Sequence, residues 1–153
     1  MEPTLFPSDY IVTQTFDSFS RGDIVVFNDP DYEDEYLVKR IVGIGGDTIS
    51  VSGGAVFLNH AYVSEPYRYS PIDYVMDPYE VPENHFFLLG DNANTSIDSH
   101  NWGASTSQSD EEAKGTPRSI SHDLIVGKVT YVYLPLSRAG KLDSYPIRVP
   151  DVR

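Results

Sequence analysis

The stretch Tyr36-Leu37-Val38-Lys39-Arg40-Ile41-Val42-Gly43 has the composition of a buried strand, yet it carries two adjacent cations. Its β-branched and apolar residues favour a strand, and the glycine-rich turn that follows ends it. Because neighbours on a strand point to opposite faces, we expect Lys39 to face inward and Arg40 to reach solvent. An inward lysine loses hydration, which favours the neutral amine, a general base at pH 7. The structural alternative is that one cation snorkels to water while the other pairs with a carboxylate.

The composition around this strand predicts a single all-β domain of antiparallel sheets with little helix. The 153 residues include 11 Tyr and 7 Phe, and 11 Gly and 11 Pro recur as turn punctuation. No stretch sustains the 3.6-residue apolar spacing of an amphipathic helix. Glycines at Gly53-Gly54 and the pair Asn59-His60 predict two tight turns. The other expected strands are 10–16, 24–27, 48–52, 55–58, 61–63, 85–89 and 124–136.

Two segments lack a strand pattern. Residues 64–84 are rich in Pro and Tyr, and we expect an ordered but irregular excursion whose tyrosines cover a hydrophobic surface. Residues 104–121 are polar and nearly devoid of apolar side chains, which is typical of a flexible loop. We interpret residues 1–153 as one domain that carries this second segment as a mobile insertion.

The charge and composition exclude several classes of function. A formal net charge of −12 argues against nucleic-acid binding, which needs a basic face for the phosphates. The acidic run 29–35 is interpreted as a solvated loop. Cysteine is absent and the four histidines lack metal-ligand spacing, so we expect neither a metal nor another cofactor. The chain also shows no 18-residue apolar run and no signal peptide of its own.

A second informative stretch is Gly90-Asp91-Asn92-Ala93-Asn94-Thr95-Ser96-Ile97-Asp98-Ser99-His100-Asn101-Trp102-Gly103, directly after the predicted strand 85–89. Short polar side chains of this kind bond their own backbone and fix tight turns, so a purely structural loop is one interpretation. A polar loop pinned between a buried strand and Trp102 is also a favourable place for catalytic groups.

Taken with the Lys39 strand, this loop resembles the type I signal peptidases, membrane-anchored serine proteases with a serine–lysine dyad. The resemblance covers nearly the whole chain in the family's order, and it implies the family's coiled, partly barrel-like antiparallel sheets. The further matching segments are Met1-Glu2-Pro3-Thr4-Leu5, Arg21 to Phe27, Gly46-Asp47, Glu65-Pro66-Tyr67, Val126-Gly127-Lys128 and Leu134-Pro135-Leu136.

The resemblance implies a role for each matching residue. Lys39 would be the general base that takes the proton of a nucleophilic serine, and Ser96 would help to orient its amine. The loop would be supported by Asp91, Asn92, Asp98 and His100, with Asp98 pairing with a cation. The substrate would be a preprotein that carries a signal peptide and lies as an added strand. The residues expected to bind it are Met1, Pro3, Tyr36, Leu37 and Val38.

Three departures from the family pattern accompany the resemblance. In the family the nucleophilic serine directly precedes the methionine matched by Met1, so we expect this serine and a membrane anchor of about 20 apolar residues to lie upstream. The loop has Ala93 and His100 where the bacterial pattern has arginine, and His100 would make a pairing with Asp98 depend on pH. The segment 104–121 stands where the family usually has a short link.

The sequence therefore predicts the catalytic domain of a signal peptidase I-like endopeptidase that removes leader peptides and would be inactive without the upstream serine. We expect a membrane-associated domain on the trans side: periplasm or exterior, or an organelle lumen or intermembrane space. Three alternatives stay open: an inactive peptide-binding β-module, a self-cleaving repressor-type protease, and a subunit of an organellar processing peptidase. Retention of Lys39 and Ser96 argues against the first, and the Gly-Asp-Asn and Glu-Pro-Tyr segments argue against the second.

Overall fold

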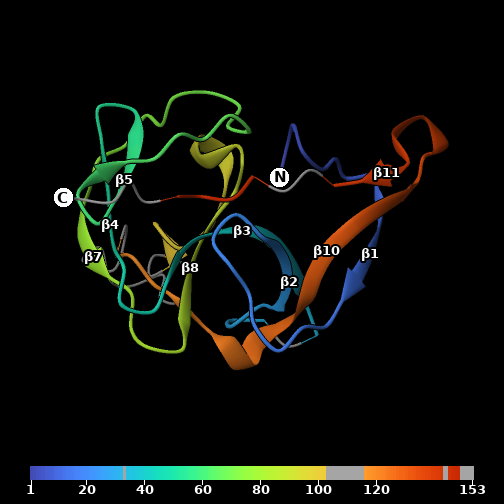
Figure 1. Cartoon of the computed structure of the whole chain (residues 1–153), viewed down its shortest axis with the longest axis horizontal. Helices are drawn as coiled ribbons and strands as arrows, with labels where there is room; N and C mark the ends of the chain where they lie inside the picture. Colours follow the sequence, from blue (N-terminus) through green and yellow to red (C-terminus); the bar gives the residue numbers. More distant parts are fainter. Residues whose placement is uncertain (33, 103–115, 143–144, 149–153) are drawn as a thin grey trace.

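The computed structural model describes residues 1–32, 34–102, 116–142 and 145–148, and the predicted all-β class with antiparallel sheets is confirmed (Figure 1). No helix in these residues is long and apolar enough to cross a membrane. The strands are β1 (Tyr10–Gln14), β2 (Ile24–Asn28), β3 (Tyr36–Ile44), β4 (Thr48–Ser52), β5 (Ala55–Leu58), β6 (Ala61–Tyr62), β7 (Met76–Glu80), β8 (His85–Leu89), β9 (Ile120–Ser121), β10 (Ile125–Leu134) and β11 (Gly140–Lys141). Short 3₁₀ segments are η1 (Ala93–Thr95), η4 (His122–Leu124) and η5 (Leu136–Arg138).

The described strands form two sheets. The larger has the order β1-β10-β2-β3-β8-β9, with β11 also paired to β10, and the smaller has the order β6-β5-β4-β7. Figure 1 shows β4, β5 and β7 at one end of the molecule and β1, β10 and β11 at the other, with β2, β3 and β8 between them. Both predicted tight turns are confirmed, because Gly53, Gly54, Asn59 and His60 all have positive φ.

The register of β3 creates the free edge on which the site is built. Residues 36–40 of β3 pair with β2, whereas residues 40–44 pair with β8 on the other side. Arg40 alone belongs to both ladders. The edge of Tyr36–Lys39 that faces away from β2 therefore has no partner strand among the described residues. Backbone groups on such an edge are open to a further strand.

The core lies between the sheets and under the excursion. Side chains of β4 alternate between buried and partly exposed, as expected for a strand covered on one face. Its buried residues Ile49 and Val51 pack with Val42 of β3 and Phe87 of β8, and all four are at most 1% exposed. Burying a Val, Leu, Ile or Phe side chain contributes about 1.5–3 kcal/mol, so this cluster holds the two sheets together.

The prediction that residues 64–84 are irregular throughout is wrong for Met76–Glu80, which form β7 against β4. Pro78 obscured this strand, because proline cannot donate a ladder hydrogen bond. The strand tolerates it since β7 lies at the edge of its sheet, with a register shift in its pairing. The expected covering role of the tyrosines is confirmed for Tyr67, which is 4% exposed within the core.

Most of the predicted insertion 104–121 lies outside the described residues, but its end does not. The expectation of a flexible loop is wrong for Ile120–Ser121, which form β9 against β8. Ile120 stands opposite Phe86 in the ladder and is 1% exposed. This buried isoleucine anchors the short strand. The polar average composition of the segment concealed the strand from sequence analysis.

Gly22 occupies a turn before β2 that tolerates no side chain. Its φ is +94°, and a β-carbon built there would lie 2.1 Å from the carbonyl oxygen of Tyr145. Its N–H donates to the carbonyl of Ile41 at 2.7 Å. The glycine thus lets the turn pack directly against the segment that follows β11.

We predict that Gly22→Ala destabilises the protein far more than Gly53→Ala, the matched control. Gly53 also has positive φ, at +58°, but no atom lies within 4 Å of its β-carbon position. The expected loss of unfolding free energy is about 1 kcal/mol at Gly53 and roughly 3 kcal/mol or more at Gly22, where backbone must move. Urea unfolding measures both, and equal losses would contradict the close packing.

Candidate active site

The amine of Lys39 and the hydroxyl of Ser96 meet although 57 positions separate them. Lys39 Nζ donates a hydrogen bond to Ser96 Oγ at 2.7 Å. Ser96 directly follows η1, and the chain reaches it by turning at Gly90, where a β-carbon would lie 2.4 Å from Ser96 Oγ. The contact between Lys39 and Ser96 predicted from the sequence is confirmed, and glycine at position 90 is what permits it.

The environment of Lys39 favours its neutral form. Burial lowers the pKa of the amine from its ordinary value, while the charge of Asp98 opposes this shift and raises it. The pKa of the Met1 amino group is also lowered, first by burial and then by the positive charge of Lys39. The Lys39 amine therefore lies within electrostatic reach of both Met1 and Asp98, beside Ser96.

The expectation that Arg40 reaches solvent is wrong, because its side chain is completely buried. Both faces of β3 are covered at this point, so strand alternation sends Lys39 to one enclosed side and Arg40 to the other. The Arg40 guanidinium donates to both carboxylate oxygens of Asp91, at 2.8 and 2.7 Å, and to the Gly22 carbonyl at 2.9 Å. Its planar group also lies 3.9 Å from the centre of the Tyr67 ring.

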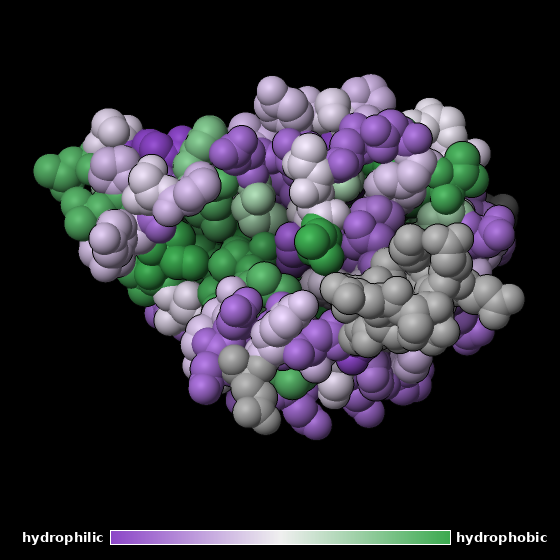
Figure 2. All heavy atoms as spheres, turned by 180° about the vertical axis from the view of Figure 1, so that it is seen from behind, coloured by the Kyte–Doolittle hydropathy of each residue, from purple (hydrophilic) through white to green (hydrophobic). Residues whose placement is uncertain are grey.

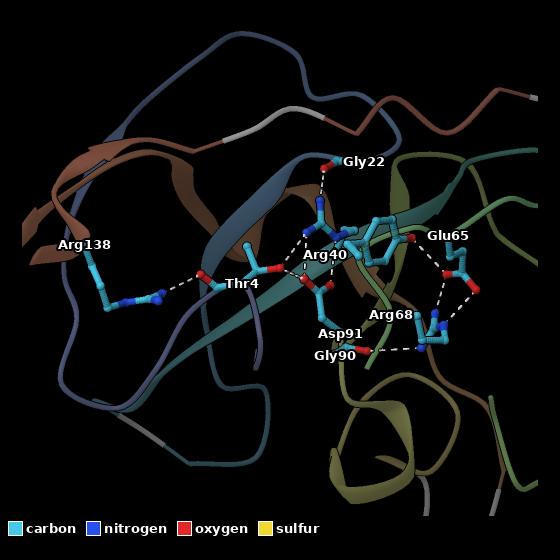
Figure 3. Close-up of polar contacts among 9 residues, drawn as sticks. Thr4, Gly22, Arg40, Glu65, Arg68, Gly90, Asp91 and Arg138 are labelled. Carbon is cyan, nitrogen blue, oxygen red and sulfur yellow. Dashed lines mark hydrogen bonds and ion pairs between the residues drawn. The ribbon is translucent and has the colours of Figure 1, made fainter. Parts of the chain in front are cut away.

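This buried pair also holds the first residues of the chain (Figure 3). The Thr4 hydroxyl donates to the Asp91 carboxylate, and Arg40 Nη2 lies 3.4 Å from the same hydroxyl. Arg138 donates to the Thr4 carbonyl at 3.1 Å from the opposite side. The segment at Met1, strand β3 and the loop after β8 are thus joined through one ion pair, which places Met1 relative to Lys39.

Asp98 anchors the other end of the loop. It is completely buried, and its carboxylate accepts the Gly90 N–H at 2.9 Å and contacts His100 Nδ1 at 2.6 Å. The predicted contact between Asp98 and His100 is confirmed, whereas a positive charge on the imidazole and the pH dependence of this pairing stay predictions. Ser99 exchanges two hydrogen bonds with Leu88 on β8, which fits a role in holding the loop.

The Lys39–Ser96 pair opens into a cleft of about 780 Å³. Among the residues predicted to bind substrate, Met1, Leu37 and Val38 line the cleft, whereas Pro3 and Tyr36 do not. Asn92, predicted as loop support, also lines it. Further lining residues that sequence reasoning missed are Leu5, Ile11, Ile97 and Trp102, together with the acidic Asp29, Asp31 and Glu35. Ile97 and Trp102 belong to the polar loop noted in the sequence, but nothing local marks the others, which reach the cleft from the first residues, from β1 and from the acidic segment before β3.

The described residues contain no group of three or more His, Asp or Glu side chains placed to hold a metal ion. The family model described as "Signal peptidase, peptidase S26" matches residues 1–134.

This chain belongs to the signal peptidase family.

Several relatives of this signal peptidase family member are known. It is 33% identical to signal peptidase I of Leptolyngbya laminosa, covering 95% of this chain and 70% of that protein. It is 39% identical to the Synechocystis protein named "Probable signal peptidase I-2", covering 93% and 62%. It is 34% identical to thylakoidal processing peptidase 1 of Arabidopsis thaliana, covering 92% and 41%. The chain thus spans less than two thirds of the last two relatives.

The fold of the signal peptidases is also shared. A crystal structure of signal peptidase I from Enterococcus faecalis superposes with a TM-score of 0.57, covering 76% of this chain and all of that one. The sequence identity is 20%, so this likeness concerns the fold.

We predict that Asp91→Asn strongly destabilises this signal peptidase domain. The substitution leaves the buried Arg40 without a counter-charge, which typically costs about 3–5 kcal/mol. The control is Asp9→Asn, which removes the counter-charge of Arg138 and should cost far less, because the Arg138 side chain is 35% exposed and stays hydrated. Urea unfolding of both variants provides the measurement. Similar losses would show that the Arg40–Asp91 pair is not what holds the three segments.

We predict that Lys39→Met raises the melting temperature at pH 7. Because the pKa of Lys39 is lowered in the folded state, the unfolded chain binds more protons between that folded value and the ordinary 10.5. Wild-type stability therefore rises with pH in this window. The melting temperature of Lys39→Met should exceed that of the wild type by a few degrees at pH 7, and this difference should shrink as the pH rises.

Thermal melts from about pH 6 to about pH 10 test this expectation. The control is Lys128→Met, which should not stabilise the protein, because Lys128 forms an ion pair with Asp23 at 2.5 Å. If the gain in melting temperature of Lys39→Met did not change with pH, it would show only that methionine packs better than lysine.

Proposed function

We propose that the chain is the catalytic domain of a serine endopeptidase that removes signal peptides from preproteins, with Lys39 as its general base. The hydrogen bond from Lys39 to Ser96 inside a large cleft carries this proposal. Burial lowers the pKa of Lys39, so the amine can accept the proton of a hydroxyl nucleophile near neutral pH. The Ser96 hydroxyl keeps the amine oriented toward that nucleophile.

The nucleophile in this proposal is a serine bonded to the amino side of Met1 in the full-length protein. The electrostatic influence of Lys39 on the Met1 amino group supports this placement. The serine hydroxyl adds to the scissile carbonyl while its proton passes to Lys39. The lysine then returns this proton to the departing amine, which leaves an acyl-serine. Water, deprotonated in turn by Lys39, hydrolyses the ester and restores the enzyme.

The free edge of β3 supports an extended peptide as the substrate. Backbone groups of Tyr36–Lys39 face away from β2 without a partner strand among the described residues, and Leu37 and Val38 line the cleft. A peptide added here would gain main-chain hydrogen bonds while its side chains enter the apolar lining around Leu5 and Ile97. Such binding selects extended segments with small side chains, as expected at the cleavage site of a signal peptide.

We also propose that the domain lies at a membrane, on the trans side where signal peptides emerge, and an exposed apolar surface supports the membrane contact. Figure 2 shows apolar side chains gathered at the end of the molecule where β1, β10 and β11 lie. Exposed apolar residues on these elements and on η5 are Tyr10, Val12, Tyr131, Tyr133, Leu134 and Leu136, with Leu136 81% exposed. An exposed apolar patch of this kind marks a surface that contacts lipid or another protein.

The test is to read the codons upstream of Met1 and to assay the correspondingly longer chain. We expect serine at the preceding position and cleavage of a peptide that spans a signal-peptide junction. Replacing that serine, or Lys39, with alanine should each lower kcat by about 10³-fold or more. Lys128→Ala is the control and should retain activity. A different residue before Met1, or cleavage that survives Lys39→Ala, would contradict the proposal and favour an inactive peptide-binding module.

A further inference from the structure

Asp98 differs from the other buried carboxylates in the partner it uses. Among the described residues four aspartates are buried, and three of them pair with a Lys or Arg side chain, which stays charged at physiological pH. These three pairs are Asp23 with Lys128, Asp47 with Arg21, and Asp91 with Arg40. Asp98 instead contacts the imidazole of His100, which is charged only when it is protonated. Asp98 is also the carboxylate whose charge raises the pKa of Lys39. The group that influences this amine therefore has a partner whose own charge can change.

His100 is held firmly in this position. Its Nδ1 lies 2.6 Å from Asp98 Oδ1, and its backbone N–H reaches the same oxygen at 3.3 Å. The imidazole stacks on the ring of Tyr74, with 3.9 Å between the ring centres and 6° between the planes. The Tyr74 hydroxyl is buried and has no hydrogen-bond partner among the described residues. Tyr74 thus acts here through its ring, as a flat support for the imidazole.

The other charges around His100 leave Asp98 as the dominant one. The charged or titratable groups facing His100 and Tyr74 are Asp98 on the same loop, Glu65, Arg68 and Asp73 of the excursion, and Asp77 and Tyr79 of β7. Glu65 and Arg68 neutralise one another through two hydrogen bonds. Asp77 is exposed on β7, so water screens its charge.

We propose that His100 is a positioning residue for the Lys39–Ser96 pair. It holds the Asp98 carboxylate in place, and its own charge sets how strongly that carboxylate favours a proton on the Lys39 amine. This inference rests on the proposed role of Lys39 as general base. With a neutral imidazole, Asp98 keeps its full charge and favours the ammonium. With an imidazolium, the ion pair cancels much of that charge and favours the free amine. The base then stays available as the pH falls.

The test measures the protonation of Lys39 directly. The chain contains four lysines, so ¹³Cε labelling of lysine gives few signals, and Lys39→Ala assigns the relevant one. In His100→Asn the side-chain amide replaces Nδ1 as a donor but cannot titrate, and in His100→Arg the charge is permanent. We expect the Lys39 midpoint to lie lower in His100→Arg than in His100→Asn by about half a pH unit or more. Equal midpoints would overturn the proposal.

A second measurement uses the wild-type chain and serves if His100→Arg does not fold. The Lys39 signal should show an inflection at the pH where the His100 imidazole signal titrates, and His100→Asn should lack it. A wild-type curve without this inflection would refute the coupling. Tyr74→Phe, which keeps the ring and loses the unpartnered hydroxyl, should leave the curve unchanged, whereas Tyr74→Leu should weaken the inflection. Neither measurement requires peptide cleavage. A failure of the His100 proposal can therefore be distinguished from a failure of the proposed function.

Discussion

The rest of the structure depends on the ion pair between Arg40 and Asp91. A buried guanidinium without a counter-charge would be too costly, and here the carboxylate, the Gly22 carbonyl and the Tyr67 ring together surround it. Buried pairs of this kind add little net stability compared with apolar side chains of similar size. Their effect is on geometry, since few arrangements satisfy every donor. Here the satisfied arrangement is the one that brings Thr4, β3 and the loop after β8 together.

Two adjacent cations acquire opposite properties from this arrangement. Arg40 meets a carboxylate at bonding distance and stays charged, as a guanidinium always does. Lys39 is one residue away on the other face, where its direct hydrogen-bond partner is a neutral hydroxyl. Burial without a bonded counter-charge lowers the pKa of an amine, whereas Asp98 limits the shift from a greater distance. The reactive group is therefore defined by what surrounds Lys39, and the neighbouring pair supplies the rigidity that keeps those surroundings in place.

The sequence predicts what depends on local pattern and misses what depends on several segments at once. Alternation, glycines and turn residues were sufficient to predict the sheets and both tight turns, whereas the contact between Lys39 and Ser96 was predicted from the resemblance to the type I signal peptidases. Alternation places Arg40 opposite Lys39, but it does not say that both faces of β3 are covered. Pro78 conceals β7, because its tolerance depends on an edge position that only the assembled sheet defines. The acidic run at 29–35 is a solvated loop by composition, yet Asp29 and Glu35 line the cleft.

The irregular excursion between β6 and β7 accounts for the position of the loop that carries Ser96. Its Tyr69 N–H donates to the Asp91 carbonyl at 3.1 Å, and Arg68 reaches the Gly90 carbonyl at 3.4 Å. Asn94 returns these contacts by donating to the Pro71 carbonyl at 2.9 Å. A regular strand presents backbone groups to its neighbours at fixed spacing and could not contact a turning loop at so many points. The prolines keep this stretch extended and irregular, and Tyr67 fills the space beneath it. An irregular segment therefore holds the candidate active site in place.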